Sequence, residues 1–488
     1  MAEKAKNHWF ILSLLALAQF MVVLDSSVVN VALPAVQNAF HMTATSLQWI
    51  VTAYTLTFGG FLLLGGRAAD LYGRKKMFVT GVTLFAIASL LDGLAQSGTM
   101  LIVLRALQGL AASMMSPAAL SIVLITYREG HERNVALSIW GAVASGGAAA
   151  GVLLGGVLTE YWGWRWNFFI NVPVAIAVVM AAVRMLPAHE SEEKHNDLDL
   201  AGAVSVTAAA LSLVYGLVEA PTHGWTAGST LAYFGASLAL LLFFIFNERR
   251  VAHPLVPLQI FKNRNLTGAD LVIFPVVASM FSTFFFGSLY LQDILKFSPV
   301  KTGLSFLIVP VAIAIAATNV PRIIKKVGYK AVLMTGPILI AISLFMMAHI
   351  PVQGSYVKDL LLPFILLGIG GGMSFVAGTI TATTGVPPRE SGLASGLLNT
   401  AQQIGGSLGL AILSGVASSQ IVKALHHLPA NVTSADAAHA YSEVHGFHAA
   451  FYVGMGFALF ASLVATLVIK QRASTGAAPD AAAAAHMG

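Results

Sequence analysis

Long apolar runs, separated by short polar connections, dominate the pattern of this chain. Each run holds about 20 residues, the helix length that crosses the roughly 30 Å hydrocarbon layer of a bilayer. The sequence therefore predicts an all-α polytopic membrane protein with 14 transmembrane helices. The expected spans are 9–33, 46–65, 77–96, 99–125, 135–159, 166–187, 199–219, 229–248, 266–292, 302–321, 330–350, 358–382, 391–419 and 447–470.

The basic residues are distributed unevenly among the connections. Cytoplasmic connections carry an excess of Lys and Arg, and placing the N-terminus inside puts most of the 27 basic residues there. Both termini are then expected to be cytoplasmic. The basic connections around 184–194 and 249–264 lie on the same side, so the two runs between them form an inserted transmembrane hairpin.

An internal repeat divides the remaining spans into two halves. Residues 66–73, which close span 2, align without gaps with residues 321–328, which close span 10. Parallel repeats of six-helix halves occur in secondary transporters. We expect an N-terminal six-helix bundle in 1–187, the inserted hairpin with its flanking loops in 188–250, a C-terminal six-helix bundle in 251–472 and a disordered tail in 473–488.

Composition excludes several classes of function. The chain is 57% hydrophobic and 10% charged, whereas soluble domains hold about 25% charged residues. It has no cysteine, which excludes disulfides and thiolate metal sites. The net charge of +6 is spread between the apolar runs, a distribution typical of membrane topology and not of nucleic-acid binding. The histidines of the connection near 420–446 fit no metal-ligand spacing, so no metal or cofactor is expected.

Two ionisable residues lie well inside the predicted spans, Asp25 in span 1 and Arg105 in span 4. A helix rises 1.5 Å per residue, which places Asp25 roughly 12 Å and Arg105 roughly 9 Å from the same side of the membrane. The two residues are therefore nearly level. An intramembrane carboxylate that a cation approaches in one state and leaves in another can bind and release a proton. A static ion pair between the two spans is the alternative interpretation.

Several segments resemble the major facilitator superfamily, and in particular its fourteen-helix drug/proton antiporter family. Residues 66–76 resemble the superfamily signature between helices 2 and 3, and residues 104–109 are similar to its helix 4 motif. Further resemblance is carried by residues 24–34, 164–173 and 395–406. Together these motifs cover nearly the whole chain in the expected order.

The resemblance implies alternating access by rocking of the two bundles. It also implies that Asp25 takes up the coupling proton and that Arg105 modulates it. The gating motif carried over from the family comprises Gly66, Asp70, Gly73 and Arg74. Asp70 is expected to face the N-terminal end of span 13 when the cytoplasmic side is closed, because a helix N-terminus favours a carboxylate.

Span 5 carries a glycine pattern that resembles the antiporter signature of the superfamily. Its members are Gly147, Gly151, Gly155 and Gly156. Small residues at this spacing let helices approach closely, so simple helix packing explains the pattern equally well. The sequence also departs from the signature, because Gly151 is followed by Val152 where the family usually has proline.

Candidate substrate contacts lie on the helices that line the cavity in the family. Aromatic, methionine and amide side chains suit a broad and adaptable pocket. The predicted cavity residues are Asn30, Trp49, Tyr54, Gln108, Met115, Asn399 and Gln402.

These features predict a proton-coupled efflux antiporter that exports hydrophobic or amphiphilic, cationic compounds. Its expected partners are these small molecules, protons and the lipid bilayer, its energy source is the proton gradient, and it is expected to be a monomer in a bacterial cytoplasmic membrane. A dedicated exporter of a single metabolite, antibiotic or siderophore shares every motif. A passive channel is disfavoured by the repeat and gating motif, and a membrane-embedded enzyme by the lack of convergent catalytic groups in the spans.

Overall fold

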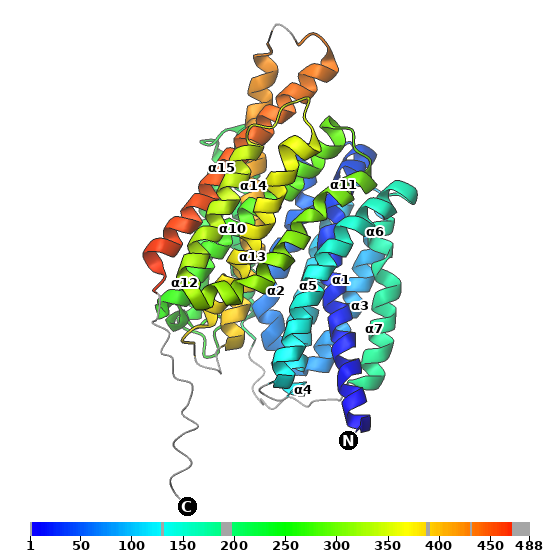
Figure 1. Ribbon diagram of the computed structural model, residues 1–488. Coiled ribbons are helices and arrows are strands. Elements are labelled where there is room, and N and C mark those ends of the chain that lie inside the picture. Colours follow the sequence, from blue (N-terminus) through cyan, green and yellow to red (C-terminus); the bar gives the residue numbers. More distant parts are fainter. Residues whose placement is uncertain (1, 128–130, 187–197, 387–390, 430–431, 471–488) are drawn as a thin grey trace, which may run out of the picture.

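A computed structural model of the protein describes residues 2–127, 131–186, 198–386, 391–429 and 432–470, and every regular element within them is helical (Figure 1). The predicted tail 473–488 lies outside the described residues. The helices are α1 (Ala2–Phe40), α2 (Ala44–Tyr72), α3 (Arg74–Gly93), α4 (Gly98–Thr126), α5 (His131–Tyr161), α6 (Trp166–Phe169), α7 (Asn171–Met185), α8 (Leu200–His223), α9 (Gly228–Glu248), η1 (Leu258–Lys262), α10 (Arg264–Leu289), η2 (Tyr290–Ile294), α11 (Pro299–Phe306), α12 (Ile308–Met347), η3 (Tyr356–Leu360), α13 (Leu361–Thr383), α14 (Ser391–His426) and α15 (Ala435–Val468).

Twelve helical stretches of the described chain are long and apolar enough to cross a membrane. The longest, Pro299–Met347, contains α11 and α12, and the backbone of α12 leaves the helical conformation at Gly328, where φ is 83°. Gly73, between α2 and α3, has φ of 96°. Glycine adopts these left-handed values without the steric penalty of a Cβ atom. The two glycines occupy matching positions in the internal repeat, so each turn needs the same residue.

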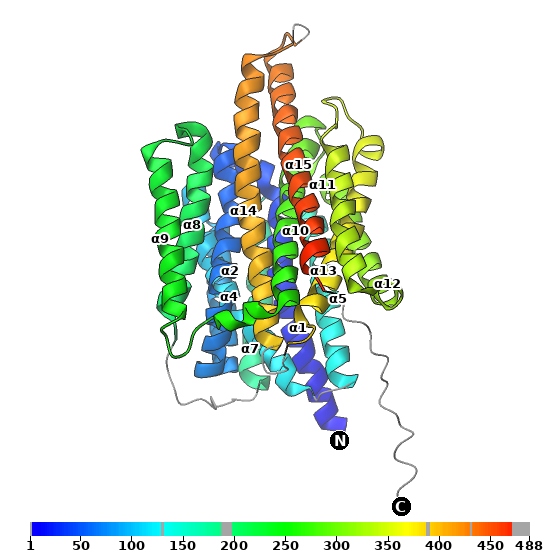
Figure 2. The same ribbon diagram turned by 90° about the vertical axis from the view of Figure 1, so that its left-hand side faces the viewer.

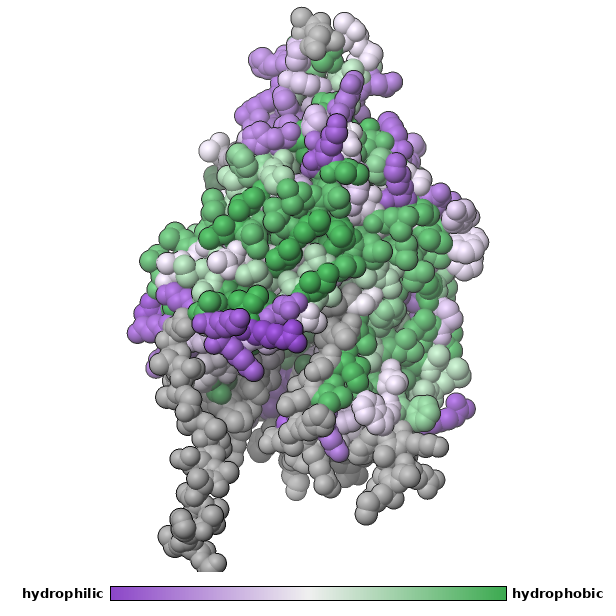
Figure 3. Space-filling view, in the orientation of Figure 1, coloured by the Kyte–Doolittle hydropathy of each residue, from purple (hydrophilic) through white to green (hydrophobic). Residues whose placement is uncertain are grey.

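The surface of the molecule has a hydrophobic band between two ends that are richer in hydrophilic residues (Figure 3). α9 is the least buried of the candidate spans and exposes Leu238, Leu242 and Phe246. Figure 2 shows α8 and α9 at the edge of the bundle, and α8 packs against α2 and α14. The hairpin therefore has one face on the protein and a hydrophobic face for lipid.

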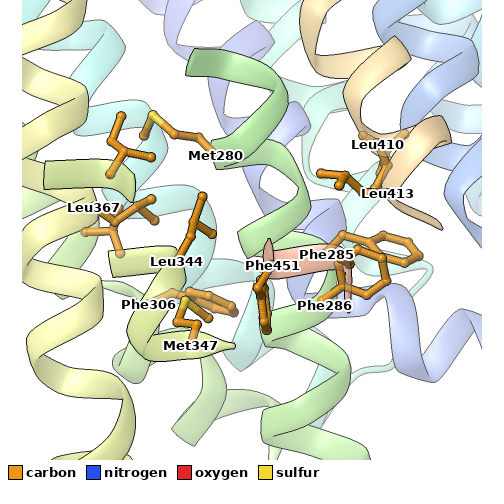
Figure 4. Packing of buried hydrophobic residues seen from close by; sticks show 14 of the residues in the cluster. Met280, Phe285, Phe286, Phe306, Leu344, Met347, Leu367, Leu410, Leu413 and Phe451 are labelled. Carbon is orange, nitrogen blue, oxygen red and sulfur yellow. The ribbon is translucent and has the colours of Figure 1, made fainter. Parts of the chain in front are cut away.

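Two large hydrophobic cores hold the bundle together. One core lies among α1–α5 and α7 and includes Phe78 and Phe85. The larger core lies among α10 and α12–α15, where Phe285, Phe286 and Phe451 pack together (Figure 4). The larger core also continues into the last turns of α1 and the first turns of α2. The two halves of the chain thus share a core where α1 ends and α2 begins, which we call the α1–α2 end; the opposite end, where α2 turns into α3, is the α2–α3 end.

Candidate functional site

Asp25 is fully buried on α1, at the centre of a hydrogen-bonded cluster. Its Oδ2 accepts a hydrogen bond from Arg105 Nη1 at 2.6 Å. Its Oδ1 accepts hydrogen bonds from Gln108 Nε2 at 2.9 Å and from Asn171 Nδ2 at 2.8 Å. All three partners donate to it, an arrangement that suits a negatively charged acceptor.

Arg105 is held from several sides. Its Nε donates to the Ile50 carbonyl oxygen at 3.2 Å, and its Nη1 also donates to Gln108 Oε1. The guanidinium carbon lies 4.2 Å from the centre of the Tyr54 ring and 5.8 Å from that of Phe168. These hydrogen bonds and ring contacts offset part of the cost of taking the arginine and its carboxylate partner out of water.

Local sequence explains why these side chains meet. Arg105 and Gln108 are three residues apart on α4, so they share one face of that helix. Asn171 is the first residue of α7, directly after the short helix α6. Asn171 was not predicted as a partner of Asp25. The sequence does contain a sign of its role, because Asn171 is a polar residue at the start of an apolar run within the motif at 164–173.

A cavity of about 870 Å³ lies between the two halves. It runs from Tyr54 and Gln402 at mid-depth to Asp70 and His253 near the α2–α3 end. Its lining is mainly apolar and amide or hydroxyl in character, and Asp70 is the one carboxylate among the described lining residues. Such a lining suits a largely hydrophobic ligand with a few polar groups.

Asp25 lies behind the cavity wall. Its chain neighbours Ser26 and Ser27 line the cavity, as does Tyr54, whereas Asp25 and Arg105 do not. The Tyr54 ring contacts Arg105 on its buried side. The tyrosine therefore separates the charged pair from the space in which a ligand would bind.

The two halves are in contact at the α1–α2 end. Gln292 Nε2 donates to the Val31 carbonyl oxygen at 2.9 Å, and the Val300 amide donates to Glu160 Oε2 at 2.8 Å. α5 also packs directly against α11. The cavity is thus closed toward the α1–α2 end, and its lining continues to the α2–α3 end.

Comparison with known proteins places the chain in a family. A model described as Major Facilitator Superfamily matches residues 15–410. The chain belongs to the major facilitator superfamily. It is 37% identical to the puromycin resistance protein pur8 of Streptomyces alboniger, with 96% of this chain and 92% of that protein covered.

Other superfamily relatives are also resistance and export proteins. The cephamycin export protein CmcT of Amycolatopsis lactamdurans is 37% identical, with 82% of this chain and 83% of that protein covered. The multidrug resistance protein Stp of Mycobacterium tuberculosis is 31% identical, with 90% of this chain and 82% of that protein covered. The chain is accordingly a transporter of this superfamily.

Solved structures share the superfamily fold. The crystal structure of the POT family transporter PepTSo matches with a TM-score of 0.69 at 16% identity, covering 95% of this chain and 97% of that one. An inward-open structure of the xylose transporter XylE from E. coli matches with a TM-score of 0.62 at 14% identity, covering 96% and 98%. At these identities the likeness concerns the fold alone.

The predicted gating motif lies at the α2–α3 end of the cavity. Gly66 and Asp70 line the cavity there, and Gly73 forms the turn into α3. Asp70 Oδ1 accepts a hydrogen bond from Arg74 Nη2 at 3.0 Å, and both side chains are partly exposed. Asp70 is thus paired with Arg74 in this structure, and its expected pairing with the start of α14 stays a prediction for a state in which this end is closed.

The span 5 glycines bring α5 close to its neighbours. A Cβ atom on Gly151 would lie 2.6 Å from Ser27 Cβ, and one on Gly155 would lie 2.8 Å from the Val28 carbonyl oxygen. Gly147 packs on α1 in the same way, against Val23. These three glycines therefore support the segment of α1 that carries Asp25. Gly156 instead packs against Pro299 of the other half.

The structure divides the predicted cavity residues into two groups. Tyr54, Asn399 and Gln402 line the cavity, whereas Asn30, Trp49, Gln108 and Met115 do not. Asn30 Nδ2 donates to the Ser26 carbonyl oxygen, the Trp49 ring packs against Tyr215 of α8, and Met115 is buried beside Gly81 of α3. Several residues that line the cavity were not predicted, including Gln19, Trp140, Phe281 and Phe375.

Proposed function

We propose that this superfamily member is a proton-coupled efflux antiporter that exports hydrophobic and amphiphilic compounds, including cations, by alternating access. The observation that carries the proposal is the hydrogen bonding of Asp25, whose three partners are all donors. A proton on Asp25 removes the negative charge that faces Arg105, so the ion pair weakens and its donors are free to move away when the proton binds. The donors sit on α4 and α7, and protonation is thereby linked to movement of α1 relative to those helices.

Antiport also needs proton and substrate to influence one another. The Tyr54 ring contacts Arg105 on one side and lines the cavity on the other. A ligand that presses this ring toward Arg105 holds the Arg105–Asp25 pair together and disfavours a proton on Asp25, whereas a proton on Asp25 releases Arg105 toward the ring. Tyr54 thus couples substrate binding in the cavity to proton binding at Asp25. Proton entry then supplies about 2.3 kcal/mol per charge for each 100 mV of membrane potential.

The proposed topology has fourteen spans with both termini in the cytoplasm of a bacterial cell. Two additions to the twelve candidate spans give this number. One is α5, which is 31 residues long and packs on α1, and the other comes from the division of α12 at Gly328 into two spans. The α2–α3 end is then cytoplasmic and the α1–α2 end external, in a cytoplasmic-membrane protein that acts as a monomer without a cofactor.

The contact between α2 and α14 supports alternating access. Thr45 and Thr55 of α2 are hydrogen bonded to Ser418 and Ser407 of α14. Gln48 and Thr52 lie between the two threonines on the same face of α2, and their buried polar atoms have no hydrogen-bond partner among the described residues. Buried polar groups without partners are costly. Water would satisfy them if the α1–α2 end opened, so the closed seam is suited to reversible opening.

Closure of this end is expected to weaken when Gly156 is replaced by valine. A Cβ at position 156 would lie 2.5 Å from the Pro299 carbonyl oxygen of the other half. Overpacking costs about 1–3 kcal/mol, which corresponds to about 5-fold to 150-fold less of the closed state. The chain has no native cysteine, so disulfide formation between Thr45→Cys and Ser418→Cys reports closure of this end.

Gly235→Val is the control, because nothing lies within 4 Å of a Cβ atom at position 235. Equal disulfide formation in the Gly156→Val and Gly235→Val variants would refute the expectation.

The cavity chemistry supports hydrophobic substrates. Phe58, Phe281, Phe375 and Trp140 line it together with the amides of Asn399 and its neighbours. Aromatic faces accept both apolar rings and organic cations. A cation therefore needs no buried carboxylate in the cavity itself.

Transport by purified protein in proteoliposomes tests the proposal. With puromycin as the first probe, an imposed pH gradient is expected to drive accumulation against the puromycin gradient, and collapse of the pH gradient is expected to stop it. Ethidium and rhodamine 6G, which are chemically unrelated dyes, are expected to be transported as well. Puromycin movement that only follows its own gradient, with or without a pH gradient, would overturn antiport.

The second candidate is a dedicated exporter of one antibiotic or other metabolite. It is favoured by relatives that are named for single compounds, such as the cephamycin export protein and the tetracenomycin C resistance and export protein of Streptomyces glaucescens. Expression that raises resistance to a single compound, with no change for the dyes, would select this alternative.

A further inference from the structure

Asp92 is a second buried acid close to the Asp25 cluster. It lies in the last turn of α3, is 0% exposed, and neither of its carboxylate oxygens has a hydrogen-bond partner among the described residues. The α6 segment covers this end of α3: Phe169 packs on Gly93, and Arg165 Nη2 donates to the Ala95 carbonyl oxygen at 3.1 Å. Asp92 is thus sealed from solvent on the external side of Asp25 in the proposed topology.

Burial without hydrogen-bond partners in the described chain favours a neutral acid at Asp92. The charges of Arg105 and Asp25 act on it in opposite directions. Three further groups lie on or beside the other elements packed against α3. Tyr54 of α2 faces Arg105, and Arg165, which precedes α6, donates to a carbonyl oxygen. Arg184 lies in the last turn of α7, at the far end of that helix. Arg105 is already paired with Asp25. An ionised Asp92 would therefore add an uncompensated buried charge without hydrogen bonds, which is unfavourable.

Polar side chains connect the positions of the two acids. Ser89 is three residues before Asp92 on α3, so the two share a face of the helix. The Ser89 hydroxyl accepts a hydrogen bond from Asn171 Nδ2 at 3.0 Å, and the same amide donates to Asp25 Oδ1 at 2.8 Å. Ser89 Oγ itself donates to the Phe168 carbonyl oxygen at 2.8 Å. Ser89 therefore lies on the same face of α3 as Asp92 and is hydrogen bonded to the amide that holds Asp25.

We propose that Asp92 is a second proton-binding carboxyl group, through which protons from the external side reach Asp25. In the state described here the proton is on Asp92. When Arg105 leaves Asp25, the Asp92 carboxyl group gives its proton to the Asp25 carboxylate, with the Ser89 hydroxyl between them. Asp92 becomes the carboxylate and is reprotonated from the external side when the α6 segment opens. The role of Asp92 in delivering protons to Asp25 rests on the proposed proton coupling. The claim that Asp92 is protonated in the substrate-free protein does not.

Infrared spectroscopy of the purified, substrate-free protein tests the protonation at neutral pH. Asp92→Asn is expected to remove a carbonyl-stretch band of a protonated carboxyl group, and Asp436→Asn, which changes an exposed residue of α15, is expected to remove none. Unchanged protonated-carboxyl bands in Asp92→Asn would overturn the proposal. This measurement needs no transport, so its outcome is independent of the proposed function.

Two transport modes in proteoliposomes test the pathway, with puromycin as the probe. Asp92→Asn is expected to slow puromycin transport driven by a pH gradient by about 100-fold, because a positioned proton-transfer group is lost. Puromycin exchange at equal pH, which moves no net protons, is expected to stay close to wild type. Ser89→Ala is expected to slow the driven mode alone and to keep the Asp92 infrared band.

The outcomes separate the two proposals. Wild-type rates of driven transport in Asp92→Asn, or equal loss of driven transport and exchange, would overturn the role of Asp92; the second result would mean that the residue only supports the fold. If the wild-type protein itself shows no transport driven by a pH gradient, proton coupling fails instead, and the infrared result still decides whether Asp92 is protonated.

Discussion

Asp25→Asn is expected to abolish transport driven by a pH gradient, with a loss of about 100-fold or more in the initial rate of puromycin accumulation. An amide cannot take up the proton that the cycle transfers. It also offers a single acceptor oxygen where the carboxylate receives hydrogen bonds from Arg105, Gln108 and Asn171. At least one buried donor then loses its partner.

Puromycin exchange at equal pH distinguishes lost coupling from lost binding. We expect Asp25→Asn to retain exchange, because Asp25 does not line the cavity. Asp436→Asn, the same change at an exposed position, is the matched control and should transport as wild type does. Normal gradient-driven accumulation by Asp25→Asn would rule out the coupling role of Asp25.

Arg105→Gln is expected to lower the free energy of unfolding by about 3–5 kcal/mol, since it leaves the Asp25 carboxylate buried without its cation. The Asp25→Asn/Arg105→Gln double variant is expected to recover most of that loss, because both charges are then absent. Thermal unfolding of the purified variants measures the difference.

The matched control for this series is Arg165→Gln. Arg165 is exposed, and within the described parts of the chain it donates one hydrogen bond, to the Ala95 carbonyl oxygen, and lies over the Trp164 ring, so its loss should change stability much less. A double variant no more stable than Arg105→Gln alone would show that the two charges do not compensate each other in the folded protein.

Simple physical regularities were enough to predict that Asp25 and Arg105 lie close together. The rise of a helix and the thickness of a bilayer set the depth of each residue, and two charges at one depth in an apolar bundle are expected to pair. Hydropathy likewise predicts a helical membrane protein, because bilayer-spanning stretches of this length and composition have few other structures. The turns at Gly73 and Gly328 follow the internal repeat in the same way.

Rotation about the helix axis is harder to predict. Gln108 was assigned to the cavity, yet its spacing of three residues from Arg105 puts it on the face that meets Asp25. Trp49 and Met115 also point away from the cavity, toward α8 and α3. In a membrane-spanning helix both the protein side and the lipid side are apolar, so hydrophobic periodicity does not reveal which face lines a cavity.

Asp92 and Asn171 were missed for a related reason. Each lies near the end of an apolar run, where a polar residue ordinarily meets headgroups or water. The α6 segment buries both, and its position over α3 depends on lateral packing that the sequence pattern does not contain. Their burial became apparent only from the contacts of α3, α6 and α7.

The release of protons on substrate binding tests the central claim most directly. Addition of puromycin to purified, weakly buffered wild-type protein is expected to release protons into the medium, because binding favours the state in which Asp25 is a carboxylate. Asp25→Asn is expected to bind puromycin without this release. Proton release from Asp25→Asn equal to that of wild type, or puromycin binding to wild type without any release, would contradict the account.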